Sequence, residues 1–519
     1  MSYLQKYKVS IILFTINFIV KGLFLASNSL GADEPFSVYH AQMNIQSIIS
    51  LLSYGNNPPL YEIILHYWIK YWGISEISVR FPSLIFSSLT VIYIYKIGFK
   101  YFNYRIALYS SILFIFSNYH ILFAHQARVY SFLGLLSVIS MYYFMGILNN
   151  CREESLEKST IRREFISLII INTLIIYSHY FGFFILIIQF LLTISHKKMV
   201  SKYWRSIVLL LAIVALLYTP NIYVLLNRFF ESSTHGTWVK PPDGIDSLYN
   251  MLRSLSNAPV VTVIILLILL ASLVKSIIRK QVISIYTRVI VFWFFFIFIF
   301  MFIISYSIPM FSERYLMPAS VAFIIIIAIS LDYLVEKKNY RYVLPCLVIM
   351  IYAFTIEPNI SNKRNVRETV AKIKDIQSTE TLVIICPANF IVNFAYYYDP
   401  DVFKEYGNTS NYSNIHQTMR KENIYGINSI NDVDLKKWEH IVFLDAAANF
   451  SRPNNGILEY LNINYELSKS YYYHEIFNIS EYKINSTGDR VGDDKPSESS
   501  AMHIDNVRVY QKRNERYDA

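Results

Sequence analysis

The sequence contains few cysteines and lacks the glycine-rich loops that bind nucleotide phosphates. Its 519 residues include three cysteines, Cys151, Cys346 and Cys386. These are too few and too scattered for a disulfide framework, and none has the spacing of a metal-ligand set. No glycine-rich phosphate loop and no strong internal repeat is present. The sequence therefore gives no sign of a disulfide scaffold, a zinc module or a common nucleotide-binding fold.

Charge is also sparse, while apolar residues are abundant. Charged residues make up 16% of the chain and hydrophobic residues 54%, and the mean hydropathy is +0.34. A soluble protein of this length would not contain so many long apolar runs. The first run has no small-residue cleavage site of the A-x-A kind, so we do not interpret it as a cleaved signal peptide. The composition predicts a polytopic α-helical membrane protein, embedded in the lipid bilayer, with a polar domain appended.

Eleven segments are long and apolar enough to be predicted as transmembrane helices. They are Val9–Leu30, Ser78–Phe99, Ile106–Phe123, Val129–Leu148, Phe165–Tyr180, Phe183–Ile194, Ile207–Leu226, Val260–Val274, Val289–Ile308, Leu316–Leu334 and Tyr342–Phe354.

The net charge of +10 comes from lysines and arginines that are dispersed among alternate short loops. Such loops face the cytoplasm by the positive-inside rule, so we expect no nucleic-acid binding. The amino terminus is then cytoplasmic, and the loop at 31–77 and the carboxyl-terminal domain are extracytoplasmic. We therefore expect a transmembrane domain over 1–356 and a soluble α/β domain over 357–519.

Within the first extracytoplasmic loop, His40–Leu52 and Leu60–Trp72 have the pattern of short amphipathic helices, which commonly lie in the membrane interface. In the carboxyl-terminal domain, Leu382–Cys386, Ile441–Leu444 and Val507–Tyr510 are predicted strands, and Val366–Ser378 is a predicted helix. The stretch Ser486–Ser500, rich in glycine, aspartate and serine, is expected to be a mobile loop.

Polar residues gather at the extracytoplasmic ends of the predicted spans. The adjacent acids Asp33 and Glu34 follow the first span directly, where an acid is costly unless it has a partner or a task. Other candidates at the same membrane face are Glu62, His66, His125, Arg128, Tyr130, His179, Arg314 and Tyr315. Singly, each has a plain explanation, since interfacial arginines extend to lipid headgroups and tyrosines are common there. Together they predict a site at the bilayer surface.

Glycosyl transfer from a lipid-linked phosphosugar requires this combination of groups. Arginine pairs with phosphate and stabilises the charge that grows on it as it leaves. A carboxylate takes the proton of the acceptor hydroxyl. Such a donor needs no nucleotide outside the cytoplasm, in agreement with the missing nucleotide-binding motif.

The amino-terminal part, roughly Met1–Leu334, resembles the polyprenyl-phosphate-dependent GT-C glycosyltransferases, and most of all glycosyltransferase family 39. That family includes protein O-mannosyltransferases and the lipid A aminoarabinose transferase. The matching words, in order, are Gly31-Ala32-Asp33-Glu34-Pro35-Phe36-Ser37, Asn57-Pro58-Pro59-Leu60-Tyr61, Ser75-Glu76-Ile77-Ser78-Val79-Arg80-Phe81-Pro82-Ser83, His125-Gln126-Ala127-Arg128-Val129-Tyr130-Ser131, Ser178-His179-Tyr180-Phe181-Gly182 and Glu313-Arg314-Tyr315-Leu316-Met317-Pro318.

The resemblance implies an inverting transferase that uses a polyprenyl-phosphate-linked sugar donor and an unknown envelope acceptor. The acceptor is a lipid, a glycan or a protein, and the expected location is a bacterial inner or cell membrane. It also implies that Asp33 is the catalytic acid of the first loop with Glu34 as its partner, and that Arg128 and Arg314 bind the lipid phosphate. Many relatives carry an acid where Gln126 stands, so a metal or a second acid there is in doubt. The resemblance does not extend to the carboxyl-terminal domain, for which the sequence suggests no family.

Two other functions remain open, a transporter or flippase of lipid-linked saccharides and a polysaccharide ligase or polymerase. Transporters often place ionisable groups near the bilayer midplane and contain repeated halves, features that this sequence lacks. Asp33, Glu62, His66 and His125 also offer ligands suited to a divalent metal, although no tight spacing supports such a site. The sequence leaves the sugar, the acceptor, the lipid length and the metal dependence undetermined.

Overall fold

The computed structural model describes residues 3–484, except 32, 54, 56, 154–157, 236, 238, 338, 361–363, 406–411 and 475–476. The chain divides into two compact units. The first unit comprises Met1–Asn28 and Ser37–Asn362, and the second comprises Ser29–Phe36 and Lys363–Ala519. The second unit thus includes a short segment of the predicted first loop in addition to the carboxyl-terminal region.

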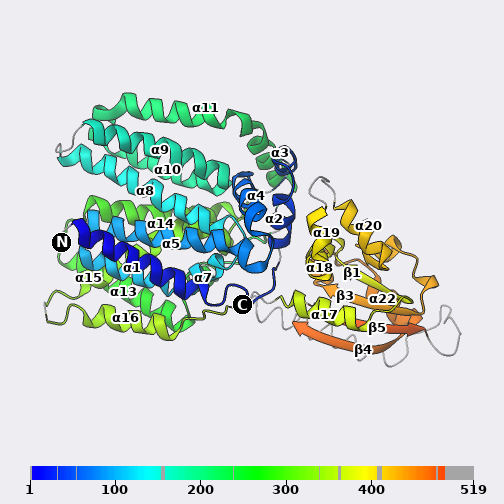
Figure 1. Cartoon of the computed structure of the whole chain (residues 1–519). Helices are drawn as coiled ribbons and strands as arrows, with labels where there is room; N and C mark the ends of the chain where they lie inside the picture. Colours follow the sequence, from blue (N-terminus) through cyan, green and yellow to red (C-terminus); the bar gives the residue numbers. More distant parts are fainter. Residues whose placement is uncertain are drawn as a thin grey trace. The chain divides into compact units, whose positions relative to one another are not determined.

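The first unit is built from helices, the longest of which run side by side (Figure 1). Its helices are α1 (Tyr3–Gly22), α2 (Glu34–Ala41, whose first turn is in the second unit), α3 (Ile45–Leu52), α4 (Leu60–Trp72), α5 (Glu76–Tyr101), α6 (Tyr104–Ile115), α7 (Asn118–Ala124), α8 (Tyr130–Glu153), α9 (Lys158–Ser178), α10 (Phe183–Ser195), α11 (Lys197–His235), α12 (Asp246–Ser254), α13 (Pro259–Ile278), α14 (Ile285–Ile304), α15 (Met317–Leu334) and α16 (Val343–Phe354).

Each of the eleven predicted transmembrane segments overlaps one or two of these helices. Among the described residues, six helices are long and apolar enough to cross a bilayer, or seven if a bent pair is counted as one span. The helices Tyr180–Ser195 and Val343–Phe354 are apolar but shorter. The expected count of eleven spans is therefore not confirmed, whereas an integral multi-pass membrane protein is.

The segment Ile106–Phe123, predicted as one span, is in fact two helices, α6 and α7, bent by 59°. The break leaves backbone groups at the two helix ends without partners inside their own helices. Asn257 satisfies two of them, because its Nδ2 donates to the Phe116 carbonyl at 2.7 Å and its Oδ1 accepts from the Asn118 amide at 2.9 Å. A side chain 139 residues further along the chain thus stabilises the bend.

The close packing of α5 against α6 depends on a glycine. A Cβ atom at Gly98 would lie 2.4 Å from the Cα of Ala107, a separation that no side chain can adopt. Small residues allow helices to approach in this way within membranes. The α5–α6 pair is therefore held at backbone contact distance.

The first-loop helices differ in part from the prediction. The predicted helix His40–Leu52 is divided between α2 and α3, because the Asn44 side chain accepts from the Ser47 amide at 2.8 Å and caps a new helix there. Helix α4 has the predicted bounds and ends at Gly73, whose φ is +72°. Its side with Glu62 and Leu65 is buried, whereas Tyr71 on the aromatic side is exposed. The polar face of α4 is thus partly turned into the unit.

The second unit contains a five-stranded sheet of order β2-β1-β3-β5-β4. Strand β1 is parallel to β2 and β3, β5 is antiparallel to β3, and β4 is antiparallel to β5. The elements are α17 (Val366–Ile376), β1 (Thr381–Cys386), α18 (Ile391–Tyr398), α19 (Pro400–Glu405), α20 (Ser413–Lys421), β2 (Ile424–Gly426), β3 (His440–Ala446), α21 (Ala448–Ser451), α22 (Ile457–Asn464), β4 (Tyr465–His474) and β5 (Phe477–Ile484).

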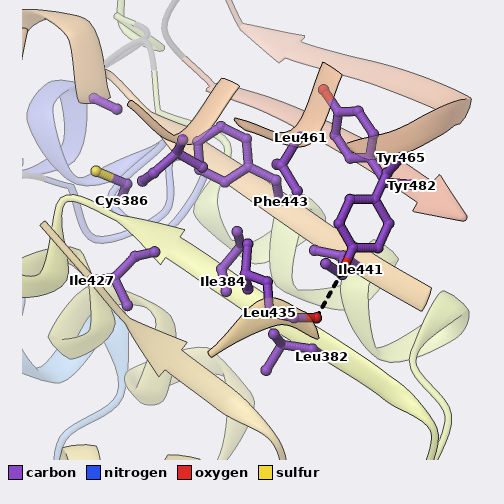
Figure 2. Packing of buried hydrophobic residues seen from close by; sticks show 12 residues of the cluster. Leu382, Ile384, Cys386, Ile427, Leu435, Ile441, Phe443, Leu461, Tyr465 and Tyr482 are labelled. Carbon is purple, nitrogen blue, oxygen red and sulfur yellow. Dashed lines mark hydrogen bonds between the residues drawn. The ribbon is translucent and has the colours of Figure 1, made fainter. Parts of the chain in front are cut away.

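All six residues of β1 are buried, as expected of a parallel strand covered on both faces. Figure 2 shows the core on one side of the sheet, where Ile384 and Phe443 of neighbouring strands pack with Leu461 and Tyr465. The Tyr465 hydroxyl donates to the Leu435 carbonyl at 2.7 Å, so this buried phenol is satisfied. The predicted strand Val507–Tyr510 and the predicted loop Ser486–Ser500 lie outside the described residues.

The loop segment Ser29–Phe36 packs within the second unit through three described contacts. The Leu30 amide donates to the Tyr397 hydroxyl at 2.5 Å, and the Arg367 amide donates to the Ser29 hydroxyl at 3.1 Å. The rings of Phe36 and Tyr412 meet edge to face with centroids 5.5 Å apart. Residues of α17 and α18, and the residue preceding α20, thus hold the segment that carries Asp33.

Candidate functional site

Asp33 and Glu34 lie in the turn that starts α2, within the second unit. The Glu34 carboxylate is buried and accepts from the Gly31 amide at 3.0 Å, while the Glu34 amide donates to the Gly31 carbonyl at 3.1 Å. Glu34 therefore closes this turn. Asp33 directly precedes the first helical residue, is partly exposed, and lies at the helix end that favours negative charge.

In the first unit, a serine bridges Glu62 and Arg128. The Ser37 hydroxyl donates to Glu62 Oε1 at 3.1 Å and accepts from an Arg128 guanidinium nitrogen at 2.6 Å. Glu62 lies on α4, Ser37 on α2, and Arg128 in the connection between α7 and α8. Three segments of the chain thus form one polar cluster, which we call the Glu62–Ser37–Arg128 bridge.

The electrostatic state of this bridge follows from burial. Burial raises the pKa of the Glu62 carboxyl, and the Arg128 charge acts in the opposite direction. Nearby, burial and the Arg128 charge lower the pKa of His40 to about 4. His40 is therefore neutral at pH 7, and the positive charge of this region is that of arginine.

His179 lies at the centre of a second cluster in the first unit. Its ring stacks on that of Phe181, with the two ring centroids 5.2 Å apart. The centroid of the His179 ring lies 6.1 Å from that of Tyr130 and 5.8 Å from that of Tyr315. Nδ1 accepts from the Phe181 amide at 3.1 Å, which fixes the ring orientation. Arg314 points a guanidinium nitrogen at the Tyr130 hydroxyl, 3.5 Å away.

The two arginines act on the same histidine. The charges of Arg128 and Arg314 both act on the buried His179 imidazole. Both guanidinium groups therefore lie within electrostatic range of one neutral imidazole. Arg314 also lies over the Tyr130 ring, 5.9 Å from its centroid. Guanidinium groups bind phosphate in bidentate geometry, so both arginines are candidates for a phosphate contact.

Two predicted metal or substrate candidates, His66 and His125, contact backbone carbonyls. His66 Nδ1 contacts the Ala41 carbonyl at 2.8 Å, and His125 Nε2 contacts the Lys21 carbonyl at 2.6 Å. Within the part of the chain that the structure describes, no three His, Cys, Asp or Glu side chains are grouped so as to hold a metal ion. The arrangement thus gives no support to a metal site built from Asp33, Glu62, His66 and His125.

Sequence reasoning missed two residues that organise these clusters, Ser37 and Phe181, and one buried arginine outside them, Arg80. Ser37 and Phe181 belong to the matching words, but a single serine or phenylalanine carries no signal of its own. Arg80 is almost fully buried on α5, and one of its guanidinium nitrogens donates to the carbonyls of Leu25 and Asn28 at 2.9 and 2.7 Å. An arginine inside a predicted span was the available signal, because buried charge there needs partners.

A cavity of about 310 Å³ lies among α8, α9, α10 and α11. Its walls are mostly apolar, and among the few polar lining residues are Asn172, Gln189 and Thr193. Phe183, which follows the His179–Phe181 segment in sequence, contributes to the lining. A cavity of this kind suits a hydrocarbon chain better than a polar ligand.

Comparisons with known proteins agree with the sequence-based resemblance. The model of the dolichyl-phosphate-mannose-protein mannosyltransferase family matches residues 56–223. No curated protein sequence matches the chain.

Solved structures match over nearly the whole chain. ArnT from Cupriavidus metallidurans in the apo state has a TM-score of 0.59 at 10% identity, covering 92% of this chain and 98% of that chain. ArnT bound to undecaprenyl phosphate has a TM-score of 0.57 at 9% identity, covering 95% and 99%. The archaeal oligosaccharyltransferase AglB from Archaeoglobus fulgidus, in complex with an inhibitory peptide and a dolichol-phosphate, has a TM-score of 0.53 at 11% identity, covering 95% and 76%. The matched segment and the shared fold confirm the predicted resemblance of this integral membrane protein to the GT-C glycosyltransferases.

Proposed function

We propose that this protein transfers a sugar from a polyprenyl-phosphate donor to an envelope acceptor at the extracytoplasmic face of the membrane. The observation that carries the proposal is that Arg314 lies 3.5 Å from the Tyr130 hydroxyl, next to the His179 ring, while Arg128 contacts Ser37 at 2.6 Å. Both arginines are permanently charged and precede apolar helices, Arg128 before α8 and Arg314 before α15. A lipid phosphate has its charge at this level and its tail in the bilayer.

In the proposed reaction, Asp33 accepts the proton of the acceptor hydroxyl as that oxygen attacks the anomeric carbon. The bond between the anomeric carbon and the phosphate oxygen breaks, and the lipid phosphate leaves with the electron pair. Arg128 and Arg314 stabilise the negative charge on the leaving phosphate. Attack opposite to the leaving group inverts the configuration of the sugar.

Two further features support a lipid-linked donor. The apolar cavity among α8–α11 is suited to an isoprenoid chain. The family whose model matches is named for dolichyl-phosphate-mannose, and the similar structures of ArnT and AglB contain undecaprenyl phosphate and dolichol-phosphate. We extend these ligands to the present chain as a chemical class.

Asp33→Asn tests the proposal. Asparagine has nearly the same shape but cannot act as a base, so transfer should fall about 10²–10⁴-fold. Binding of the polyprenyl-phosphate sugar and folding should be unchanged. Asp375→Asn is a matched control, because Asp375 is an exposed acid of α17 in the same unit.

The assay uses purified protein with a panel of undecaprenyl-phosphate hexoses and pentoses and a membrane extract as acceptor. Near-normal turnover of Asp33→Asn would overturn its assignment as the base. Loss of donor binding by a folded Asp33→Asn protein would transfer its role to donor recognition. No turnover by the wild-type protein with any donor of the panel would contradict the function.

A further inference from the structure

The contact of Glu62 with Ser37 accounts for only one of its two carboxyl oxygens. Its side chain is 3% exposed, and Oε1 accepts from the Ser37 hydroxyl. Its other oxygen, Oε2, is buried and has no hydrogen-bond partner among the described residues. Leaving a buried polar atom unsatisfied typically costs about 1–3 kcal/mol, and more if it is charged. Such an atom in a native fold calls for an explanation.

Another buried acid of the first unit provides the comparison. Glu164 on α9 accepts from Asn150 at 2.6 Å through Oε2 and pairs with Lys100 at 3.5 Å through Oε1. Both carboxyl oxygens of Glu164 thus have partners among the described residues, whereas Oε2 of Glu62 does not.

The position of Glu62 relative to Arg128 indicates what that partner is. A single hydroxyl, that of Ser37, separates the carboxylate from the guanidinium that we assign to the donor phosphate. In a glycosyl phosphate the sugar ring is attached to the phosphate through one oxygen. If Arg128 binds the phosphate, the ring hydroxyls of the sugar lie within a few ångströms of that phosphate. Glu62 is separated from Arg128 by a similar distance, that of the Ser37 hydroxyl bridge.

We propose that Glu62 Oε2 binds a ring hydroxyl of the donor sugar, which makes Glu62 a residue that determines sugar specificity. This inference rests on the proposed function and deepens it. The hydroxyl supplies the partner that Oε2 lacks. A sugar without a hydroxyl at that position leaves the carboxyl oxygen buried and unpaired, and sites of this kind discriminate strongly against such analogues. The contact is selective because Glu62 is buried, so that water cannot replace a missing sugar hydroxyl.

The test separates sugar recognition from phosphate recognition. Glu62→Gln keeps the shape and the Ser37 contact but replaces one carboxyl oxygen by an amide. We expect the variant to bind undecaprenyl phosphate, which carries no sugar, with wild-type affinity. With the undecaprenyl-phosphate sugar that the wild-type protein uses best, kcat/KM should fall about 10- to 100-fold, mostly through KM. Glu164→Gln should leave both quantities unchanged, provided that it folds.

Deoxy-sugar donors identify the contact. One monodeoxy analogue of the active donor should be a poor substrate for the wild-type protein, and Glu62→Gln should cost nothing further with that analogue. Additive losses with every analogue would overturn the proposal. An equal loss of undecaprenyl phosphate binding and of turnover in Glu62→Gln would also overturn it, because Glu62 would then only position Arg128.

The failure of this inference is distinguishable from failure of the proposed function. Arg128→Lys should weaken binding of undecaprenyl phosphate itself, because lysine cannot form the bidentate contact. If Arg128→Lys binds normally, the phosphate site is wrong. If Arg128→Lys binds poorly while Glu62→Gln behaves as wild type with every donor, the phosphate site stands and the sugar contact is wrong.

Discussion

Replacing Arg80 by methionine removes a buried guanidinium that stabilises the turn after α1, the segment 25–28. Arg80 lies on α5 with 1% of its surface exposed. One guanidinium nitrogen donates to the Leu25 carbonyl at 2.9 Å and to the Asn28 carbonyl at 2.7 Å. These two carbonyls belong to the chain just before the segment that carries Asp33. Methionine fills a similar volume but offers no donor.

The expected loss of stability follows from these two bonds. A hydrogen bond that involves a charged group contributes about 1.5–3 kcal/mol. Removing the charge also removes the cost of burying it, which offsets part of the loss. We therefore expect Arg80→Met to lower the free energy of unfolding by about 3 kcal/mol, which is roughly a hundredfold in the equilibrium constant. Arg80→Lys keeps the charge on a shorter, single-headed group and should lose about half as much.

The assay is reversible unfolding in mixed detergent micelles, followed by circular dichroism. Arg288→Met is the matched control, because Arg288 lies in the first turn of α14 and is exposed. Exposed substitutions usually change stability by less than about 0.5 kcal/mol. If Arg80→Met is as stable as Arg288→Met, the two carbonyl contacts of Arg80 do not stabilise the segment 25–28, and the reasoning is refuted.

Four further predictions concern the loop, the site and the topology. Tyr397→Phe removes the hydroxyl that accepts from the Leu30 amide, so hydrogen exchange at the Leu30 amide should accelerate about fivefold. Tyr398→Phe is the control, because the Tyr398 hydroxyl contacts Gln377 and not Leu30. Equal exchange rates at Leu30 in the two variants would contradict the contact. The pKa of His40 is lowered to about 4, so the unfolded chain binds a proton at this histidine more readily than the folded chain does. The free energy of unfolding should therefore fall as the pH drops from about 6.5 to 4. His40→Gln should reduce this pH dependence, and an unchanged dependence in the variant would refute the prediction. Arg314→Lys should raise the KM for the donor at least about tenfold, since the ammonium lacks the bidentate geometry, and wild-type kinetics would mean that Arg314 does not bind phosphate. Reporter fusions after Asn149 and after Pro358 should lie on opposite sides of the membrane, and a common side would contradict the predicted topology.

Local sequence patterns were sufficient for most of the helical architecture. Apolar runs of 12–22 residues overlap helices in all eleven cases, because a bilayer-spanning segment has to satisfy its own backbone hydrogen bonds. Helix α4 was predicted with its observed bounds from the amphipathic pattern of Leu60–Trp72. The strands β1 and β3 were found because each is a short, continuous apolar run.

Other elements were invisible to the same reasoning. The strands β4 and β5 are rich in polar and aromatic residues and lie beyond β3 in the sheet, so no continuous apolar run identified them. The break between α6 and α7 was missed because the segment Ile106–Phe123 was interpreted as one apolar run, although Ser117, Asn118 and His120 interrupt it at the break. It depends on Asn257, which local pattern cannot connect to Phe116 and Asn118.

For the site, the sequence alone indicated which residue types gather at one end of the predicted spans: the acids of the first loop, the arginines, the histidines and the tyrosines. Only the tertiary structure decided which of them meet. It places Arg314 against Tyr130 beside His179 and links Glu62 to Arg128 through Ser37, while His66 and His125 contact backbone carbonyls. The physical reason is that spacing along a chain limits partners only within a helix turn or two. Contacts between residues such as Ser37 and Arg128, 91 positions apart, depend on how the helices pack.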